Sequence, residues 1–280
     1  MLTRRWLVNC ALILVIVVLA WTSFHFAAES EEKSSPRISS LKAEDVDRIE
    51  LQGDALQLTL RRDGEGWRIT APVDWPADTA NVKRLLSILK LESSALAEVA
   101  DVDLQALGLQ PPKATLRLND TTLAFGASNN IGGRRYVLID SRIYLVPDVH
   151  LTFAAQGMPG IVDRRLLPGD LDISTLRLPE LEIRRSEGQW QSSRDATTTQ
   201  DQLELLVGNW QALPASRIHL FDAGAGPGEP IEAHFTNGQR IDFLLLSTQP
   251  EIIIANPGIG LQYHFRANLY NQLIAPAADG

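Results

Sequence analysis

Apolar and polar residues alternate along two stretches of the chain that resemble each other closely. The first stretch, residues 58–70, reads LTLRRDGEGWRIT, and the second, residues 181–193, reads LEIRRSEGQWQSS. Alternation with a period of two is typical of a β-strand with one buried face. A stripe of apolar residues at helical spacing follows each stretch: Val82, Leu85, Leu86 and Leu89 after the first, and Leu203, Leu206, Val207 and Trp210 after the second. Each stretch therefore predicts strands followed by one amphipathic helix.

The two copies keep almost the same spacing from strand to helix. Trp190 follows Trp67 by 123 positions, and Val207 follows Leu86 by 121. Asp78 is expected to cap the N-terminus of the first helix, and threonines precede the second helix. Two further pairs of segments, each predicted as a β-hairpin, continue the match: residues 115–125 with 232–243, and residues 135–146 with 251–265. We infer an internal duplication of a strands–helix–strands module.

These patterns predict an α+β fold made of two repeated, mainly antiparallel modules. The copies differ in their middles, where residues 101–112 of the first copy add a short predicted helix that ends at Gly108. A segment with several prolines and glycines separates the copies, and we expect it to form a connector with one or two helical turns. The predicted organisation is a first module at 45–147, a connector at 148–169, a second module at 170–274 and a tail at 275–280.

The N-terminus has the pattern of a membrane anchor. After two arginines, residues 6–28 are almost entirely apolar, which is long enough for a helix that crosses the bilayer. Acidic residues follow, so the positive-inside rule predicts that residues 1–5 are cytoplasmic and that the bulk of the chain is periplasmic. Residues 29–44 are polar and are predicted to form a stalk. A cleaved signal peptide is the alternative, but this apolar segment is long for one, and no small residue stands three positions before a cleavage after Ala28. We expect a single-pass protein of the inner (cell) membrane.

Net charge and cysteine content argue against nucleic-acid binding and against sites built from several cysteines. The formal net charge is −8, and the chain has a single cysteine, Cys10. Proteins that bind nucleic acid present a basic surface, so this charge argues against that class. A single cysteine excludes an internal disulfide and any metal site built from several thiolates.

Three histidines are the most enzyme-like residues of the chain. His234 and His264 fall on the polar phase of predicted strands, and His219 is out of phase with its apolar neighbours. Two imidazoles on neighbouring strands would be able to share a metal ion, but neither a metal-ligand spacing nor a paired carboxylate accompanies them. We interpret them as histidines on the solvent-facing side of a sheet. The sequence therefore predicts no catalytic residue, metal ligand or cofactor, and a protein that is not an enzyme.

Two aspartates and two tryptophans have a structural and a functional interpretation. Asp74 and Asp78 have the residue type of a glycosidase acid pair, but a turn and a helix cap explain both. Trp67 and Trp190 are suited to stacking on a ligand. Their repeated position, behind two arginines and before a helix, favours packing between strand and helix instead.

Two consecutive arginines occur at the same place in each copy, as Arg61 and Arg62 and as Arg184 and Arg185. Because successive side chains of a strand point to opposite faces, one arginine of each pair faces outward. We interpret these residues as part of a solvated sheet face. The alternative is a pair of equivalent cationic patches that contact an acidic partner.

The chain resembles a bacterial family of domains of unknown function, family 4340. The residues that carry the resemblance are Gly66, Trp67, Pro72, Ala77, Asp78, Val82, Leu85, Leu86 and Leu89, followed by Leu104, Leu107, Gly108, Leu109 and Pro112. The likeness extends over about residues 41–270, and Leu107 stands where the family often has an aromatic residue. The resemblance implies an exported, single-span protein, often encoded beside ABC-2-type transporter components of the kind linked to gliding-motility export. It implies no catalytic or binding residue.

Two functions fit these observations. We expect a membrane-anchored periplasmic scaffold that contacts protein partners, such as the permease subunits of an ABC-type export or envelope complex. The alternative is a periplasmic ligand-binding protein whose cleft lies between the two modules. The two differ in where the binding surface lies, because a ligand needs a closed cleft and a protein partner needs an open edge or patch.

Overall fold

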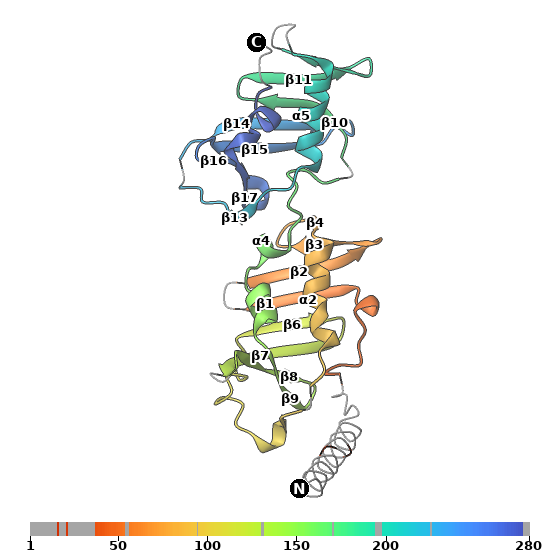
Figure 1. Cartoon of the computed structure of the whole chain (residues 1–280), viewed down its shortest axis with the longest axis vertical. Coiled ribbons are helices and arrows are strands. Elements are labelled where there is room, and N and C mark those ends of the chain that lie inside the picture. Colours follow the sequence, from red (N-terminus) through yellow and green to blue (C-terminus); the bar gives the residue numbers. More distant parts are fainter. Residues whose placement is uncertain are drawn as a thin grey trace, which may run out of the picture.

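The computed structural model describes residues 16, 21, 37–53, 56–93, 95–129, 132–169, 171–193, 198–224 and 226–276. Two antiparallel sheets lie end to end along the long axis of the molecule (Figure 1). The predicted anchor, residues 6–28, lies outside the described residues except for two positions. Among the residues that are described, no helix has the length and apolar character that a membrane span requires.

The first sheet has nine strands in the order β4-β3-β2-β1-β6-β7-β8-β9-β5. All neighbouring strands in it pair antiparallel. Its strands are β1 (Arg48–Gly53), β2 (Leu56–Asp63), β3 (Gly66–Ala71), β4 (Trp75–Ala77), β5 (Ala97–Glu98), β6 (Ala114–Leu118), β7 (Thr121–Asn129), β8 (Arg134–Ile139) and β9 (Arg142–Pro147). We call this sheet and the helix α2 (Thr79–Leu86) the first module.

The second sheet has eight strands in the order β12-β11-β10-β14-β15-β16-β17-β13, again all antiparallel. Its strands are β10 (Ile173–Leu178), β11 (Leu181–Ser186), β12 (Gln189–Ser192), β13 (Arg217–Leu220), β14 (Glu229–Phe235), β15 (Arg240–Ser247), β16 (Glu251–Asn256) and β17 (Leu261–Arg266). Together with the helices α5 (Gln200–Ala212) and α6 (Tyr270–Leu273), this sheet forms the second module.

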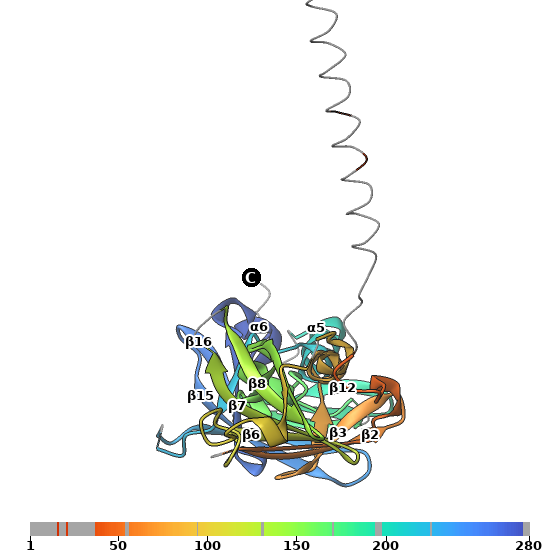
Figure 2. The same cartoon turned by 90° about the horizontal axis from the view of Figure 1, so that it is seen from below.

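The two sheets follow the same path. If β3 is matched with β12 and each later strand with its counterpart, eight strands occur in the same order in both sheets, and β4 is the additional strand of the first. The helix stands at an equivalent point in both modules: α5 follows β12 directly, α2 follows β3 with the additional β4 between them, and each helix precedes the short edge strand, β13 or β5. The helices gather on one side of the molecule, as the view along the long axis shows (Figure 2).

Tight turns account for the hairpins that the alternating pattern predicts. Asn119 turns β6 into β7 with a φ of 52°, and Asp140 turns β8 into β9 with a φ of 53°. Asparagine and aspartate tolerate this left-handed conformation better than most residues. The Asn119 carboxamide also accepts hydrogen bonds from the backbone N–H groups of Asp47 and Arg48, at 3.0 Å each, so it ties the start of β1 to this turn. Gly238 supplies the corresponding turn of the second module, with a φ of 84°.

Each helix begins at the expected cap and buries the expected stripe. The Asp78 carboxylate accepts hydrogen bonds from the backbone N–H groups of Ala80 and Asn81, at 2.8 and 3.0 Å. Thr199 and Gln202 form a capping box at the start of α5. All eight stripe residues are buried. After α2 the chain tightens into a 3₁₀ helix over Ser87–Lys90, which keeps Leu89 in the core.

Two segments differ from the prediction. Residues 104–108 form successive turns and no α-helix. The reason is a tertiary contact: the Leu107 carbonyl accepts a hydrogen bond from Ala127 N–H of β7 at 2.8 Å, and Gly108 turns the chain with a φ of 64°. The described end of the predicted stalk, residues 37–44, packs on the first module. There the Ile38 side chain is buried, because burial against the apolar core removes its apolar surface from water. The Ile38 N–H donates to the Leu91 carbonyl at 3.1 Å.

The single large aromatic residue of α5 provides a test of this packing. Trp210 is fully buried, its Nε1–H donates to the Leu273 carbonyl at 2.7 Å, and its ring meets Phe243 edge-on at 5.5 Å. We expect Trp210→Ala to lower the free energy of unfolding by about 3–5 kcal/mol, because it leaves a cavity and a carbonyl without its donor. Urea unfolding of the full chain in detergent measures this change.

Leu205 on the same helix is the matched control, because 58% of it is exposed. Leu205→Ala is expected to stay within about 0.5 kcal/mol of the unchanged protein. Equal losses for the two variants would contradict the packing described for α5.

Candidate functional site

The segment between the modules is joined to the edges of both sheets. It contains α3 (Val149–Ala154) and α4 (Met158–Ile161), so the expected helical turns are present. Beyond α4, Val162 pairs with Ala77 of β4, and Arg165 pairs with Pro214 just before β13. We call residues 161–167 the junction segment. It therefore lies between the two sheets as a short strand-like bridge.

Hydrogen bonds fix the junction segment on both sides. On the first module, Asp78 N–H donates to the Ile161 carbonyl at 2.7 Å, and Asp163 N–H donates to the Pro76 carbonyl at 3.0 Å. On the second module, Ala215 N–H donates to the Arg164 carbonyl at 2.8 Å.

The Arg164 side chain strengthens the second contact. Its guanidinium donates to the carbonyls of Ala215 and Ser216, the latter at 2.6 Å. Leu166 and Leu167 of the same segment are buried in the core. The two modules thus share one hydrophobic core across the junction.

A tyrosine of the second module is buried close to this junction. Tyr263 of β17 is fully buried, and Trp75 of β4 and Asp163 lie near its hydroxyl group. Burial raises the pKa of the Tyr263 phenol, and the negative charge of Asp163 acts in the same direction. No hydrogen bond of normal geometry reaches this hydroxyl among the described residues. Tyr263 is therefore neutral at physiological pH and contributes mainly packing.

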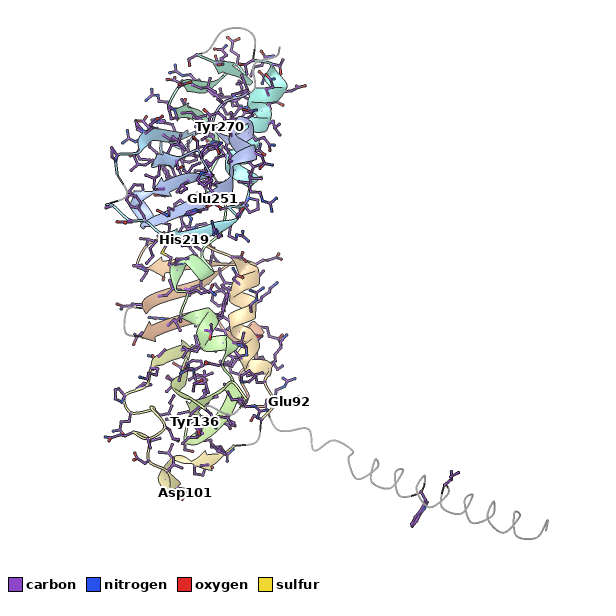
Figure 3. The ribbon with its side chains drawn as sticks, turned by 60° about the vertical axis from the view of Figure 1, so that its left-hand side comes forward. Glu92, Asp101, Tyr136, His219, Glu251 and Tyr270 are labelled. Atoms are coloured by element: carbon purple, nitrogen blue, oxygen red, sulfur yellow. The ribbon has the colours of Figure 1, made fainter. Side chains whose placement is uncertain are left out.

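A cleft with a volume of about 470 Å³ opens where the two modules meet. Helix α2, the two connector helices, the junction segment and β13 supply its walls. Its lining residues are Asp78, Asn81, Arg84, Phe153, Gln156, Pro159, Gly160, Arg164, Ser216, Arg217, Ile218 and His219. We call it the junction cleft. Figure 3 shows His219 at the base of the second module, next to the first.

The charged groups of the junction cleft differ in how they are neutralised. Arg217 donates two hydrogen bonds to the Glu251 carboxylate, at 2.6 and 2.7 Å. Arg84 lies over the Phe153 ring, with its guanidinium carbon 5.5 Å from the ring centre. No carboxylate in the described part of the chain forms an ion pair with Arg84 or Arg164.

A second groove, of about 520 Å³, lies at the start of α2. Two arginines line it, and each is matched with an aspartate: Arg68 Nε lies 2.5 Å from Asp74, and Arg165 forms an ion pair with Asp163. The hydrogen bonds that the Arg165 guanidinium donates to the Asp163 carboxylate raise the pKa of Arg165. Because these aspartates already neutralise the arginines, the groove has less unpaired positive charge for a ligand than the junction cleft has.

One of the three histidines is placed differently from the prediction, since His219 is exposed, His234 is half-buried and His264 is buried. His234 and His264 lie on β14 and β17, which two other strands separate, so they do not share a site. His234 is bound to Glu232, at 2.9 Å. His264 is buried, with 8% of it exposed, so its assignment to a solvent-facing position is wrong. Side chains of the two neighbouring strands contact it: His219 of β13 and Glu251 of β16.

The sequence did not suggest that His264 contacts His219. Their ring centres are 4.8 Å apart, with one ring edge-on to the other. This contact depends on the pairing of β13 with β17, whose residues are more than 40 positions apart, and no local pattern encodes it. The Glu251 carboxylate lies 3.2 Å from His264 Nδ1. Within the described residues, no group of three or more metal-ligating side chains forms.

The repeated arginines and tryptophans occupy equivalent positions in the two modules. Arg62 is paired with Trp67 across β2 and β3, and Arg185 is paired with Trp190 across β11 and β12. In both pairs the guanidinium stacks on the indole, at 4.9 Å in the first and 5.8 Å in the second. Trp67 is buried and Trp190 is half-buried against the core. The second arginine of each pair thus covers a tryptophan.

The first arginine of each pair is exposed, as the strand geometry predicts. Arg61 is solvent-facing, and Arg184 forms an ion pair with Glu182 at 2.8 Å. Arg62 is the most engaged of the four, because it also donates to the carbonyls of Ala43, Glu44 and Val46. That any of the four contacts a partner stays a prediction.

Removal of the Arg164 guanidinium tests the junction. We expect Arg164→Ala to leave the carbonyls of Ala215 and Ser216 without a donor, at a cost of about 1–3 kcal/mol to the local contact. The backbone amide of Ala215 should then exchange with deuterium about fivefold faster or more. Arg61→Ala removes the same side chain from an exposed position and should leave the exchange unchanged. An unchanged rate at Ala215 in Arg164→Ala would contradict this role.

Glu251 makes the stability of the second module, at the end that meets the first module, depend on pH. The hydrogen bond with His264, and then the one with Arg217, hold the pKa of its carboxyl below the usual value. A carboxyl with a lowered pKa in the folded state stabilises the fold above its ordinary pKa, and this contribution disappears as the pH falls through the lowered value. We expect Glu251→Gln to be less stable than the unchanged chain at pH 7 and equal to it near pH 3, as measured by thermal unfolding. A difference that is the same at both pH values would contradict the ionic contribution.

The chain matches the family described as "Domain of unknown function (DUF4340)" over residues 67–221, from the start of β3 to the end of β13. The match covers more than half of the 280 residues and includes every residue that lines the junction cleft. No curated protein and no solved structure matches the chain. The chain belongs to the DUF4340 family of domains of unknown function.

Proposed function

We propose that this protein is a membrane-anchored periplasmic scaffold, an accessory component of an ABC-type export or envelope complex. The N-terminal sequence supports the anchor and its orientation, with the bulk of the chain on the periplasmic side of the inner membrane. The resemblance to the family supports the link with ABC-type transporters. The shape and construction of the described region support a role in contacting other proteins.

The observation that carries the proposal is the joined, end-to-end arrangement of the two sheets (Figure 1). Neighbouring strands lie about 4.8 Å apart, so two such sheets in line extend to roughly 70–80 Å. The junction segment binds the two sheets into one body with a common core. An elongated and continuous body of this kind holds binding surfaces at a fixed distance from a membrane, which is what a scaffold requires.

We also infer that the two modules arose by internal duplication, as the sequence predicts. The shared strand order, the equivalent helices and the equivalent Arg–Trp pairs support this inference. Duplication lengthens a protein without new chemistry, because each copy supplies a sheet that packs on the same kind of helix. Duplication therefore fits a protein whose function depends on its length and on the surface that it presents to partners.

The ends of the two sheets offer a second kind of binding surface. Strands β5 and β12 are the outer strands at the two ends of the molecule, and in the described part of the chain no strand pairs with their outer edges. An open edge accepts an extended segment of a partner through backbone hydrogen bonds. Arg185, next to Trp190 at the β12 end, adds a positive charge for an acidic partner.

Crosslinking in native membranes tests the scaffold. The full chain, with a photocrosslinker in place of exposed Gln189 on β12, should capture a permease or ATPase subunit of an ABC-type transporter after gentle detergent extraction. A crosslinker in place of exposed Asp120, in the turn between β6 and β7, is the control for general proximity and should capture less. Recovery of the uncrosslinked chain alone from both variants would contradict the proposal.

The junction cleft favours a second candidate, a ligand-binding protein. Its volume of about 470 Å³ lies within the range of small-molecule sites, and residues of both modules line it. If this candidate holds, a small molecule extracted with the purified protein should raise its melting temperature, and a captured transporter subunit should be absent. The scaffold is the better supported of the two, because the junction segment already fills the core between the modules.

A further inference from the structure

The junction cleft concentrates positive charge in a protein whose formal net charge is −8. Arg84, Arg164 and Arg217 reach it from three different elements: the exposed side of α2, the junction segment and β13. Asp78 is the single carboxylate among the residues that line the cleft, and it is bound to two backbone N–H groups of α2. The cleft is therefore basic against an acidic background.

Two of the three arginines, Arg84 and Arg164, have a positive charge that no carboxylate of the described residues neutralises, so it is available to a ligand. Glu251 neutralises Arg217 through two hydrogen bonds. Arg164 donates to backbone carbonyls, which are neutral acceptors and leave its charge uncompensated. Arg84 has no carboxylate partner among the described residues, and the Phe153 ring holds its guanidinium at the wall of the cleft. A guanidinium that is already placed loses less entropy when it binds a carboxylate.

The remaining lining groups suit a peptide. Asn81 and Gln156 provide side-chain amides, and Ser216 provides a hydroxyl group, all of which are able to bond a peptide backbone. Phe153 and Pro159 provide apolar surface between the charges. The walls belong to both modules, so a bound segment would contact the junction segment and α2 together.

We propose that the junction cleft binds an acidic peptide segment of a partner protein, with Arg84 and Arg164 as the residues that pair with its carboxylates. This inference rests on the proposed function, because it takes the partner to be a protein, and it adds where the partner binds and what charge it carries. Bidentate pairing between a guanidinium and a carboxylate gives such a site direction as well as affinity.

A labelled octaglutamate peptide tests the cleft directly. The full chain in detergent is titrated at low ionic strength, and fluorescence anisotropy measures the Kd. Arg84→Glu should raise the Kd by about tenfold or more, since a charge-assisted pair is lost and a repulsion is added. Arg84→Lys should retain part of the affinity. Arg84 is exposed and has no ion pair in the described region, so these variants are expected to fold.

Arg61→Glu is the matched control, because it changes the total charge equally at an exposed arginine outside the cleft. Its Kd should stay within about twofold of the unchanged chain. An equal loss in Arg61→Glu would show general electrostatic attraction and overturn the proposal, and so would an absence of binding by the unchanged chain. Inorganic phosphate is the third arm: Arg84-dependent binding of phosphate with no binding of the peptide would assign the cleft to small anions and also overturn it.

The same variant separates this inference from the scaffold function. If Arg84→Glu abolishes peptide binding and weakens capture of the transporter subunit, both are supported. If the subunit is still captured while the unchanged chain has no affinity for the peptide, the cleft assignment is wrong and the scaffold function stands.

Discussion

The contact on which the rest of the structure depends is the pairing of the junction segment with the edges of both sheets. An open sheet edge presents unpaired N–H and C=O groups, which bind water or another strand. At the junction, backbone groups of the sheet edges pair with the junction segment, because Val162 pairs with Ala77 of β4 and Arg165 pairs with Pro214, just before β13. Two modules that would otherwise be independent become one body, and the junction cleft exists because of this closure.

The repeated Arg–Trp pair explains how each module closes the end of its sheet. In the first module Trp67 is buried, since β4 lies beside β3 and Arg62 covers the indole. In the second module the equivalent Trp190 is half-buried, and among the described strands β12 has no outer neighbour. The same sequence motif thus gives a sealed end at the junction and an open end at the tip of the molecule. This difference is what makes the second end suitable for a partner.

The elements that the sequence predicts correctly are those with a local cause. Strand alternation, helical stripes, the cap at Asp78 and the turns at Asn119 and Gly238 all depend on residues within a few positions of each other. The predicted hairpins over 115–125, 135–146, 232–243 and 251–265 are present as β6–β7, β8–β9, β14–β15 and β16–β17. The pairing of β1 with β6 and of β10 with β14 joins distant segments, and the sequence did not predict it.

The features that the sequence did not reveal depend on contacts between distant segments. The turns at 104–108 follow from a hydrogen bond to β7, and the buried Ile38 follows from packing on the first module. The contact between His219 and His264 requires β13 to pair with β17. The basic cleft also had no local pattern, since Arg84 and Arg164 are 80 positions apart and come together only through the junction.

The central claim is that the two modules form one rigid body, and a distance measurement between them tests it most directly. Lys83 on α2 and Glu204 on α5 are exposed and occupy equivalent positions in the two modules. Both would be replaced with cysteine, Cys10 with serine, and the pair labelled with nitroxide spin labels in the full chain. Pulsed electron paramagnetic resonance should give one narrow distance distribution at the separation found in this structure. A broad distribution, or several separate distances, would contradict the account.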